Sequence, residues 1–411
     1  MNASLSEKED NDLLESLEYL IDDYMTNHLH LMGKYNFDEE LYNYLYKILY
    51  EQLFLLYDNS LNKLIHRKIQ LALNIYYKHV MPRRSYSTTF INKTKYPSQI
   101  TNQLAYLRNL PQPDQRTEKW HKFRYNMITA SNAYKAYGTP SKKNELICEK
   151  CKPLSLEYTK SRNTETPFHW GTKYEPVSVL YYEYIYDTKI EDFGCLPHPK
   201  YPYIGASPDG INVDYASGLY GRMLEIKNPT TREITGIPKE EYWIQMQLQM
   251  EVCGLNHCDF LETKFYEYEN QEAFDEDGDF YKSKEDQYKG IMLHFIVNDD
   301  NYYEYAPFQC SPKEYSIWEE NMMNKHENNT WLKHIYWRLD YVSCVLVSRN
   351  KKWFQHTRHH LENIWKIIEE ERVTGKWSER KAKSTPRKRN NSMGSEEEKP
   401  IGKLLIDMSD I

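Results

Sequence analysis

The sequence predicts an α/β protein with a helical N-terminal domain, and three observations lead to that prediction. Apolar residues recur at helical spacing through residues 10–80, and from about residue 115 helical segments alternate with short apolar strands. Hydrophobic residues make up 40% of the 411-residue chain and charged residues 27%, a balance that can bury a core. The length fits two or three domains.

The N-terminal segment should form about three helices, packed as a small bundle without catalytic groups. Gly33 and the run Asp58-Asn59-Ser60 are the expected breaks between these helices. A polar stretch then follows, and its prolines are typical of a linker: Pro82, Pro97, Pro111 and Pro113.

The mixed region should contain helices and strands in alternation. Helices are expected over Trp120–Tyr137, Tyr174–Tyr186 and Glu240–Cys253. Strands are expected over Tyr203–Ala206, Gly221–Lys227, Cys258–Tyr266 and Gly290–Val297. The acidic insertion between the last two strands is typical of a solvated loop. Residues 312–376 add helices and an apolar run typical of a strand, Tyr341–Val347.

The composition excludes several classes of protein. No apolar run reaches the length of a membrane-spanning helix, and the polar start Met1–Asp12 lacks the pattern of a secretory signal. Seven cysteines, an odd number, indicate reduced thiols and an intracellular protein of the cytoplasm or the nucleus. Because the net charge is −7, any contact with nucleic acid must come from a local basic patch.

One such patch lies near the C-terminus. Lys376–Asn390 holds seven basic residues and one acid. This composition is typical of a nuclear-targeting or nucleic-acid-binding segment, and a solvated tail without a binding role is an equal alternative.

The residues that carry chemistry lie in two short segments, 205–210 and 224–227. Side chains alternate along a strand, so Glu225 and Lys227 should share one face while Ile226 enters a core on the other. Asp209 lies in a Pro-Asp-Gly turn, and its separation from Glu225 fits a hairpin that brings the two carboxylates together. Such a pair suits Mg²⁺ or Mn²⁺, and a lysine beside the metal can orient or deprotonate a water.

Further candidates lie on the expected helices. Tyr242, Gln245 and Gln249 share one helical face, where an amide can hold a water or a phosphate oxygen. Taken alone, these three residues are explained more simply as an ordinary polar helix face. Glu175 opens another helix, where an acid commonly just complements the helix dipole. Arg124 and Ser131 are suited to a phosphate, although each residue alone also fits a structural role.

Taken together, these motifs resemble a nuclease family. The order and spacing of five blocks are similar to those of the lambda-exonuclease family and the YqaJ-type viral recombinases, within the P-D…[DE]-x-K nuclease superfamily. The blocks are Trp120-His121-Lys122-x-Arg124 with Ile128-Thr129-Ala130-Ser131, Trp170-Gly171-x-x-Tyr174-Glu175, Ser207-Pro208-Asp209-Gly210, Leu224-Glu225-x-Lys227-x-Pro229, and Tyr242-x-x-Gln245-x-Gln247.

The resemblance implies a restriction-endonuclease-like core, a central mixed sheet flanked by helices. It organises the chain as a helical domain (1–80), a linker (81–114), the nuclease core (115–320), a C-terminal α/β extension (321–377) and a basic and acidic tail (378–411). The N-terminal helices lie outside the resemblance, the acidic insertion is longer than in the phage enzyme, and the extension matches loosely.

The resemblance also assigns roles to the candidate residues. Asp209, Glu225 and the carbonyl of Ile226 would bind the catalytic metal, with Glu175 joining directly or through water. Lys227 and Gln245 would position the attacking water, and Arg124 and Ser131 would hold a terminal 5′-phosphate. The implied activity is 5′→3′ digestion of one strand of linear duplex DNA with two Mg²⁺ or Mn²⁺ ions. A single-strand annealing protein would be a partner, and a trimeric ring the assembly.

Alternatives remain beside this assignment. A structure-specific endonuclease could use the same core, and a DNA-binding scaffold could use it without catalysis. Cys148 and Cys151 have the spacing of a zinc half-site that Cys195 and His198 could complete, although scattered thiols are the simpler explanation. His356, His359 and His360 are expected to be a solvated cluster.

Overall fold

The N-terminal region folds into three helices, as the sequence predicts. They are α1 (Glu7–His28), α2 (Phe37–Leu53) and α3 (Leu61–His79), with a 3-10 turn η1 (Leu29–Leu31) after α1. Ser6 caps α1 through a reciprocal pair of contacts with Glu9, and Gly33 lies in the break before α2. The apolar stripes meet in a shared core that includes Leu17, Ile21, Leu41, Leu45, Ile65 and Ile69.

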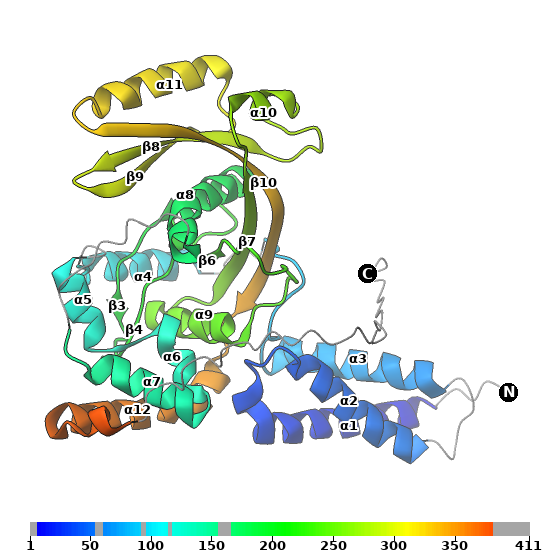
Figure 1. Ribbon diagram of the computed structural model, residues 1–411. Coiled ribbons are helices and arrows are strands. Elements are labelled where there is room, and N and C mark those ends of the chain that lie inside the picture. Colours follow the sequence, from blue (N-terminus) through cyan, green and yellow to red (C-terminus); the bar gives the residue numbers. More distant parts are fainter. Residues whose placement is uncertain (1–5, 54–60, 92–95, 114–116, 155–165, 381–411) are drawn as a thin grey trace, which may run out of the picture. The chain divides into compact units, whose positions relative to one another are not determined.

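The computed structural model describes residues 6–53, 61–91, 96–113, 117–154 and 166–380 (Figure 1). The expected break at Asp58–Ser60 and most of the basic C-terminal segment lie outside these ranges. Residues up to Arg380 belong to one compact unit. Within the described ranges, no helix combines the length and the apolar character needed to cross a membrane.

The core is a mixed seven-stranded sheet with the strand order β2-β5-β6-β7-β10-β8-β9. Only β6 and β7 pair in parallel; the other neighbours in this sheet are antiparallel. The strands are β2 (Ile190–Glu191), β5 (Gly210–Asn212), β6 (Met223–Lys227), β7 (His257–Glu267), β8 (Lys289–Val297), β9 (Asp300–Tyr305) and β10 (Thr330–Ser348).

Two helices cover opposite faces of the parallel pair β6–β7. On one face, Val179 and Tyr182 of α8 (Pro167–Tyr186) pack on Leu224 and Ile226. On the other face lies α9 (Glu240–Cys253), whose Tyr242 ring is 5.6 Å from that of Phe260 on β7. Ile226 therefore points into a core, as predicted, and Glu225 points toward α9, where it meets Gln249.

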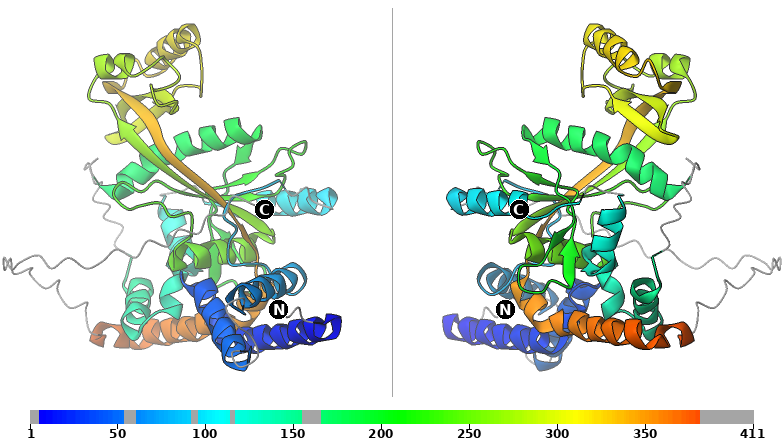
Figure 2. Two further views of the ribbon diagram at one scale, coloured as in Figure 1. Left: turned by 90° about the vertical axis from the view of Figure 1, so that its right-hand side faces the viewer. Right: turned by 90° about the vertical axis from the view of Figure 1, so that its left-hand side faces the viewer.

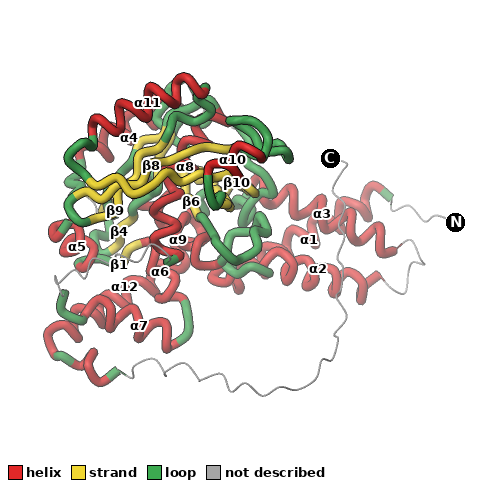
Figure 3. Tube along the Cα trace, turned by 45° about the horizontal axis from the view of Figure 1, so that its top comes forward, coloured by secondary structure: helices red, strands yellow, loops and turns green. Residues whose placement is uncertain are grey.

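The far end of the sheet is covered by α10 (Gln271–Glu276) and α11 (Pro312–Lys325), which lie over β8 and β10 (Figure 3). Phe274 of α10 and Tyr315 of α11 share a core with Ile291 of β8. The acidic insertion thus contributes a helix to the structure, whereas the sequence predicts only a loop.

A small second sheet, in the order β1-β4-β3, lies beside the main one. Its strands are β1 (Ile128–Thr129), β3 (Leu196–Pro197) and β4 (Ile204–Ala206). The helices α5 (Glu118–Tyr125) and α6 (Ala130–Tyr137) flank β1, and α7 (Pro140–Cys151) follows. The predicted single helix over Trp120–Tyr137 is therefore wrong. Its middle residues instead pair in parallel with Ile204 and Gly205.

Two segments outside the predicted core are built into it. The expected linker contains α4 (Pro97–Asn109), whose Leu104 and Leu107 are buried. The expected C-terminal extension supplies β10, which pairs with both β7 and β8 at the centre of the sheet. It also supplies α12 (Lys351–Thr374) and the 3-10 turn η2 (Lys376–Glu379). Both views in Figure 2 show α12 beside the N-terminal helices, where Asn350 reaches Met32.

Taken at the level of fold class, the prediction is confirmed. The structure has a central mixed sheet flanked by helices and preceded by a helical N-terminal segment.

Candidate active site

The two predicted carboxylates meet across the hairpin that β5 and β6 form. Gly210 pairs with Leu224, so Asp209, the residue before Gly210, lies beside Glu225, the residue after Leu224. A carboxylate oxygen of Asp209 accepts a hydrogen bond from the backbone N–H of Ile226 at 2.7 Å. The turn needs glycine after Asp209, because a Cβ at Gly210 would lie 2.2 Å from a methyl carbon of Ile190.

Glu225 is completely buried and both of its oxygens are engaged. One oxygen pairs with the ammonium of Lys227. The other accepts a hydrogen bond of 2.7 Å from the amide nitrogen of Gln249 on α9, which also donates to the carbonyl of Ser207 at 3.1 Å. The amide of Gln249 therefore ties the glutamate to the loop that carries Asp209.

The charges in this cluster do not balance. Burial raises the pKa of Asp209 well above its usual value, and the neighbouring charges of Glu225 and Glu175 raise it further. Burial works to lower the pKa of Lys227, but Glu225 and Asp209 outweigh it and hold that pKa above its usual value. Two buried carboxylates beside one ammonium leave excess negative charge, which a cation would compensate.

The donor set fits a hard divalent cation. Mg²⁺ commonly uses only one or two carboxylates and keeps several waters. Asp209 and Glu225 supply that number, and Ile226, whose carbonyl is a further candidate ligand, directly follows Glu225 in the sequence. No group of three or more His, Cys, Asp or Glu side chains that could hold a metal occurs in the described part of the chain. Water and substrate oxygens would therefore have to complete the coordination.

Glu175 and Gln245 complete the predicted metal and water site, and they differ in their relation to the carboxylates. Glu175 is exposed on α8, and its charge acts on Asp209, so it lies near the carboxylate pair. Gln245 is buried on α9, but no hydrogen bond joins it to Asp209, Glu225 or Lys227 in the described structure. Gln249, one helical turn further along, makes the contact instead.

A second group of side chains gathers around Arg124, at the end of α5. Its guanidinium donates to the hydroxyls of Ser131 at 3.4 Å and of Thr129 and Ser207 at 3.5 Å. The ring of Trp120 lies 4.5 Å from the guanidinium carbon. We call Arg124, Thr129, Ser131 and Ser207 the arginine–hydroxyl cluster. Within the described residues, Arg124 forms no ion pair with a carboxylate, so its charge can serve an anionic ligand such as a phosphate.

The carboxylate pair and the arginine–hydroxyl cluster are joined by the loop that contains Ser207 and Asp209. Ser207 places its hydroxyl in the arginine–hydroxyl cluster, while its carbonyl accepts from Gln249. Asp209 follows two residues later. Seven of the eight predicted site residues thus lie in or beside these neighbouring groups, and Gln245 is the exception.

Sequence reasoning missed the roles of Gln249, Ser207 and Thr129. Gln249 was visible as a member of the same helical face as Gln245. Ser207 and Thr129 lie inside the quoted motifs. Thr129 contacts Arg124 locally, whereas Ser207, 83 residues away, reaches it because β4 pairs with β1.

The zinc alternative lacks support in this structure. The thiol of Cys148 points to the carbonyl of Trp377 at 3.7 Å, and that of Cys151 to the carbonyl of Ile368 at 3.6 Å. Cys195 contacts the sulfur of Met127 instead. The ring of His198 accepts from the backbone of Lys200.

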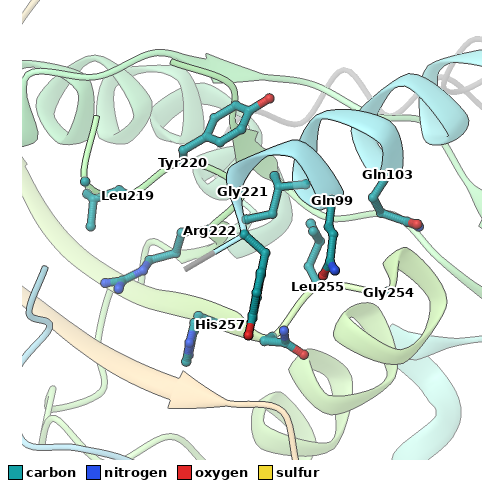
Figure 4. Close-up of a pocket in the computed structure, with 13 residues that line it drawn as sticks. Gln99, Gln103, Leu219, Tyr220, Gly221, Arg222, Gly254, Leu255 and His257 are labelled. Atoms are coloured by element: carbon teal, nitrogen blue, oxygen red, sulfur yellow. The ribbon is translucent and has the colours of Figure 1, made fainter. Parts of the chain in front are cut away.

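One cavity in the described part of the chain lies away from the carboxylates. It has a volume of about 470 Å³ and is bounded by α4, the turn before β6 and the end of α9. Gln99 and Gln103 approach from α4 and Gly254 from the end of α9 (Figure 4). Its single basic residue, Arg222, pairs with the buried Asp259 at 3.2 Å. No carboxylate lines this cavity, so it does not resemble a metal site.

Comparison with known proteins finds a viral relative, two solved structures and one protein family. The chain is 28% identical over 330 residues to an uncharacterized protein of Acanthamoeba polyphaga mimivirus. That alignment spans 69% of this chain and 59% of the viral protein.

Two solved structures are also similar, both of an alkaline exonuclease from Laribacter hongkongensis, one of them in complex with dAMP. Each is 19% identical and covers 64% of this chain and 98% of the exonuclease, with TM-scores of 0.38 and 0.37.

The model of one protein family matches the segment that carries the site. That segment, residues 119–256, contains the arginine–hydroxyl cluster, Asp209, Glu225, Lys227 and Gln249. The resemblance drawn from the motifs is thereby confirmed: residues 119–256 match the YqaJ-like viral recombinase domain.

Proposed function

We propose that this protein is a metal-dependent DNA exonuclease that digests one strand of linear duplex DNA from a 5′ end. The observation that carries the proposal is the loop 205–210, which joins a buried Asp–Glu–Lys cluster to an arginine–hydroxyl cluster. The first cluster has the donors for a divalent cation and a water, and the second has the donors for a phosphate. The match to the viral recombinase domain supports the same activity.

Each residue has a distinct task in this proposal. Asp209 and Glu225 would hold the cation, which when bound supplies charge stabilisation to the cleaved phosphate. Lys227 holds its ammonium against Glu225 and beside the ring of Tyr242, at 5.1 Å, where it can orient a water. Gln249 fixes the position of Glu225, and Arg124 with its hydroxyl partners would bind the terminal 5′-phosphate.

The remaining expectations belong to the same proposal. The product would be duplex DNA with a 3′ single strand, which an annealing protein would use in recombination or repair. Two metal ions and a trimeric ring follow from the family resemblance. The relative from a giant virus fits a role in viral DNA replication.

The test compares duplexes that carry a 5′-phosphate or a 5′-hydroxyl. The wild-type protein should digest the phosphorylated duplex faster, because Arg124 gains charge-assisted hydrogen bonds to a terminal phosphate. Those bonds are worth about 1.5–3 kcal/mol, or roughly a ten- to hundredfold rate difference. Arg124→Ala should erase most of the difference by slowing the phosphorylated substrate. Arg124→Lys should restore only part of it, since a lysine cannot form the bidentate fork.

A matched control is Arg108→Ala. Arg108 is a half-exposed arginine on α4 that pairs with Glu191, away from the arginine–hydroxyl cluster. This variant should keep the phosphate preference. Equal wild-type rates on the two ends, or nicking of closed circular DNA at a similar rate, would favour the endonuclease alternative on the same core.

A further inference from the structure

Two basic residues from distant parts of the chain clamp the end of α5, where Arg124 lies. The ammonium of Lys150, on α7, donates to the backbone carbonyl of Arg124 at 2.9 Å. The guanidinium of Arg372, on α12, donates to the carbonyl of Tyr125 at 2.6 Å and to that of Lys150 at 2.8 Å. Its carbon also lies 4.0 Å from the centre of the Tyr125 ring.

Burying the ammonium of Lys150 costs free energy of folding, so we expect its hydrogen bonds to serve a function. Lys150 is only 5% exposed, and burial lowers its pKa to about 8. The nearest carboxylate, that of Glu149, lies 4.0 Å from the ammonium and shares its charge with Lys135. A buried cation with so weak a partner destabilises a fold unless its hydrogen bonds fix something useful.

What the clamp fixes is the backbone that carries the arginine–hydroxyl cluster. The hydrogen bonds of Arg124 to its three hydroxyl partners are long, at 3.4–3.5 Å, so they hold the guanidinium loosely. The last carbonyls of a helix have no partner inside the helix. Lys150 and Arg372 satisfy two of them at the end of α5 and thereby set the position and direction of this helix end.

We infer that Lys150 and Arg372 are positioning residues for the 5′-phosphate site, acting through the backbone of Arg124 and Tyr125. The inference rests on the proposed function of Arg124 and goes beyond it. By this inference α12, which lies outside the matched domain, contributes to recognition of the 5′ end of the DNA.

The experiment measures the ratio of kcat/KM on 5′-phosphorylated and 5′-hydroxyl duplexes. Lys150→Met and Arg372→Met should each lower this ratio about tenfold, because a displacement near 1 Å can cost up to a hundredfold in rate. Rates on the hydroxyl duplex should change little, since neither residue contacts the carboxylate cluster. Arg372→Lys keeps the charge and one donor, so it should retain an intermediate ratio and a stable fold.

Lys289→Met is the matched control. Lys289 is another buried lysine, 2% exposed, whose ammonium donates to the carbonyls of Phe274, Asp277 and Asp279 at 2.5–2.8 Å. This variant should lose thermal stability to a similar extent and keep the wild-type ratio. Loss of the ratio in the control as well would show that general destabilisation explains the effect, and would overturn the inference.

The outcomes distinguish the proposed role of Arg124 from the positioning role of Lys150 and Arg372. A wild-type protein with no preference for the phosphate would refute the proposed role of Arg124. A wild-type preference that folded Lys150→Met, Arg372→Met and Arg372→Lys proteins all retain would overturn the positioning role alone.

Discussion

Asp209, Glu225 and Lys227 form a cluster whose charges make opposite contributions to stability. Removing a carboxylate relieves repulsion between buried like charges, whereas removing the lysine leaves both carboxylates without their ammonium. A purely structural ion pair would not behave in this way, because loss of either partner would then destabilise the fold.

Replacement of these three residues should therefore abolish cleavage with opposite effects on stability. Asp209→Asn keeps an acceptor for the N–H of Ile226 and should raise the melting temperature in EDTA by roughly 1 °C per kcal/mol of repulsion relieved, as expected for a folded unit of this size. Glu225→Gln should act in the same direction. Lys227→Met should lower the melting temperature and keep Mn²⁺ binding, which both carboxylate variants should lose.

These effects are measured by DNA digestion, thermal melting with and without Mn²⁺, and calorimetric titration of the ion. Wild-type turnover in any variant would remove that residue from the catalytic set. A lower melting temperature for Asp209→Asn in EDTA would contradict the repulsion argument.

The fold of α9 explains why Gln249 contacts Glu225 where the family resemblance indicates Gln245. The helix was predicted over its true span, because Pro238 precedes it and Gly254, with φ of +66°, ends it. Its sequence offers glutamines at 245, 247 and 249, all of them buried. Which glutamine reaches Glu225 depends on how α9 crosses β6, and that crossing is set by packing between distant segments rather than by local pattern.

Gln249 should therefore matter for activity while Gln247 matters for folding. Gln249→Leu removes the hydrogen bonds to Glu225 and to the carbonyl of Ser207, so cleavage should fall about ten- to hundredfold, as for other bonds to charged groups. Gln247→Leu is the matched control. Gln247 is equally buried but bonds to the backbone of Ser348 and Asn350.

The two leucine variants are compared by kcat at saturating DNA and by thermal melting. Gln247→Leu should lose stability and keep most of its kcat, whereas Gln249→Leu should lose kcat. If Gln245→Leu lowers kcat and Gln249→Leu does not, the assignment taken from the family resemblance was right and the one from this structure is wrong.

The strands β1 and β10 depend on pairing with distant segments, which hydrophobic periodicity along the sequence does not predict. The strand β1 has two residues and exists because Ile128 and Thr129 pair with a segment about 75 positions away. Helical spacing around it therefore predicted one helix where the structure has two. The strand β10 was predicted only over its apolar half, 341–347. Its other half begins with residues 330–338, which pair with β8 and mix apolar side chains with charged ones such as Lys333 and Arg338.

On the scale of the whole molecule, the sequence indicated which candidate residues come together more directly than it indicated how the segments pack into one unit. The motifs named eight candidate site residues, and the structure gathers seven of them in or beside two neighbouring groups, because these motifs combine particular residue types at particular spacings. The boundary near residue 320 had no such constraint. β10 lies between β7 and β8, and Arg372 of α12 contacts the end of α5, so the predicted extension is inseparable from the core.

The compact unit ends at Arg380, so the basic tail is the segment that follows, residues 381–411. Arg380 pairs with Glu371 on α12 and contacts Asn144 on α7, so it belongs to the folded part. Removal of residues 376–411 would break these contacts, whereas removal of 381–411 would not. Five basic residues precede the acidic patch in that shorter segment: Lys381, Lys383, Arg387, Lys388 and Arg389.

Deletion of residues 381–411 should weaken DNA binding and make it less dependent on salt, without changing kcat at saturating DNA. Each lysine or arginine that contacts a phosphate contributes about 0.9 to the slope of log K against log salt, so the slope should become shallower with the tail removed. A full-length variant with the five basic residues changed to glutamine should behave like the deletion. Binding is measured on labelled duplex from about 50 to 200 mM salt, the range over which phosphate contacts dominate. An unchanged slope in both proteins would remove the tail from DNA binding and leave nuclear targeting, or no role, as its explanation. A fall in kcat would show that the tail reaches the active site.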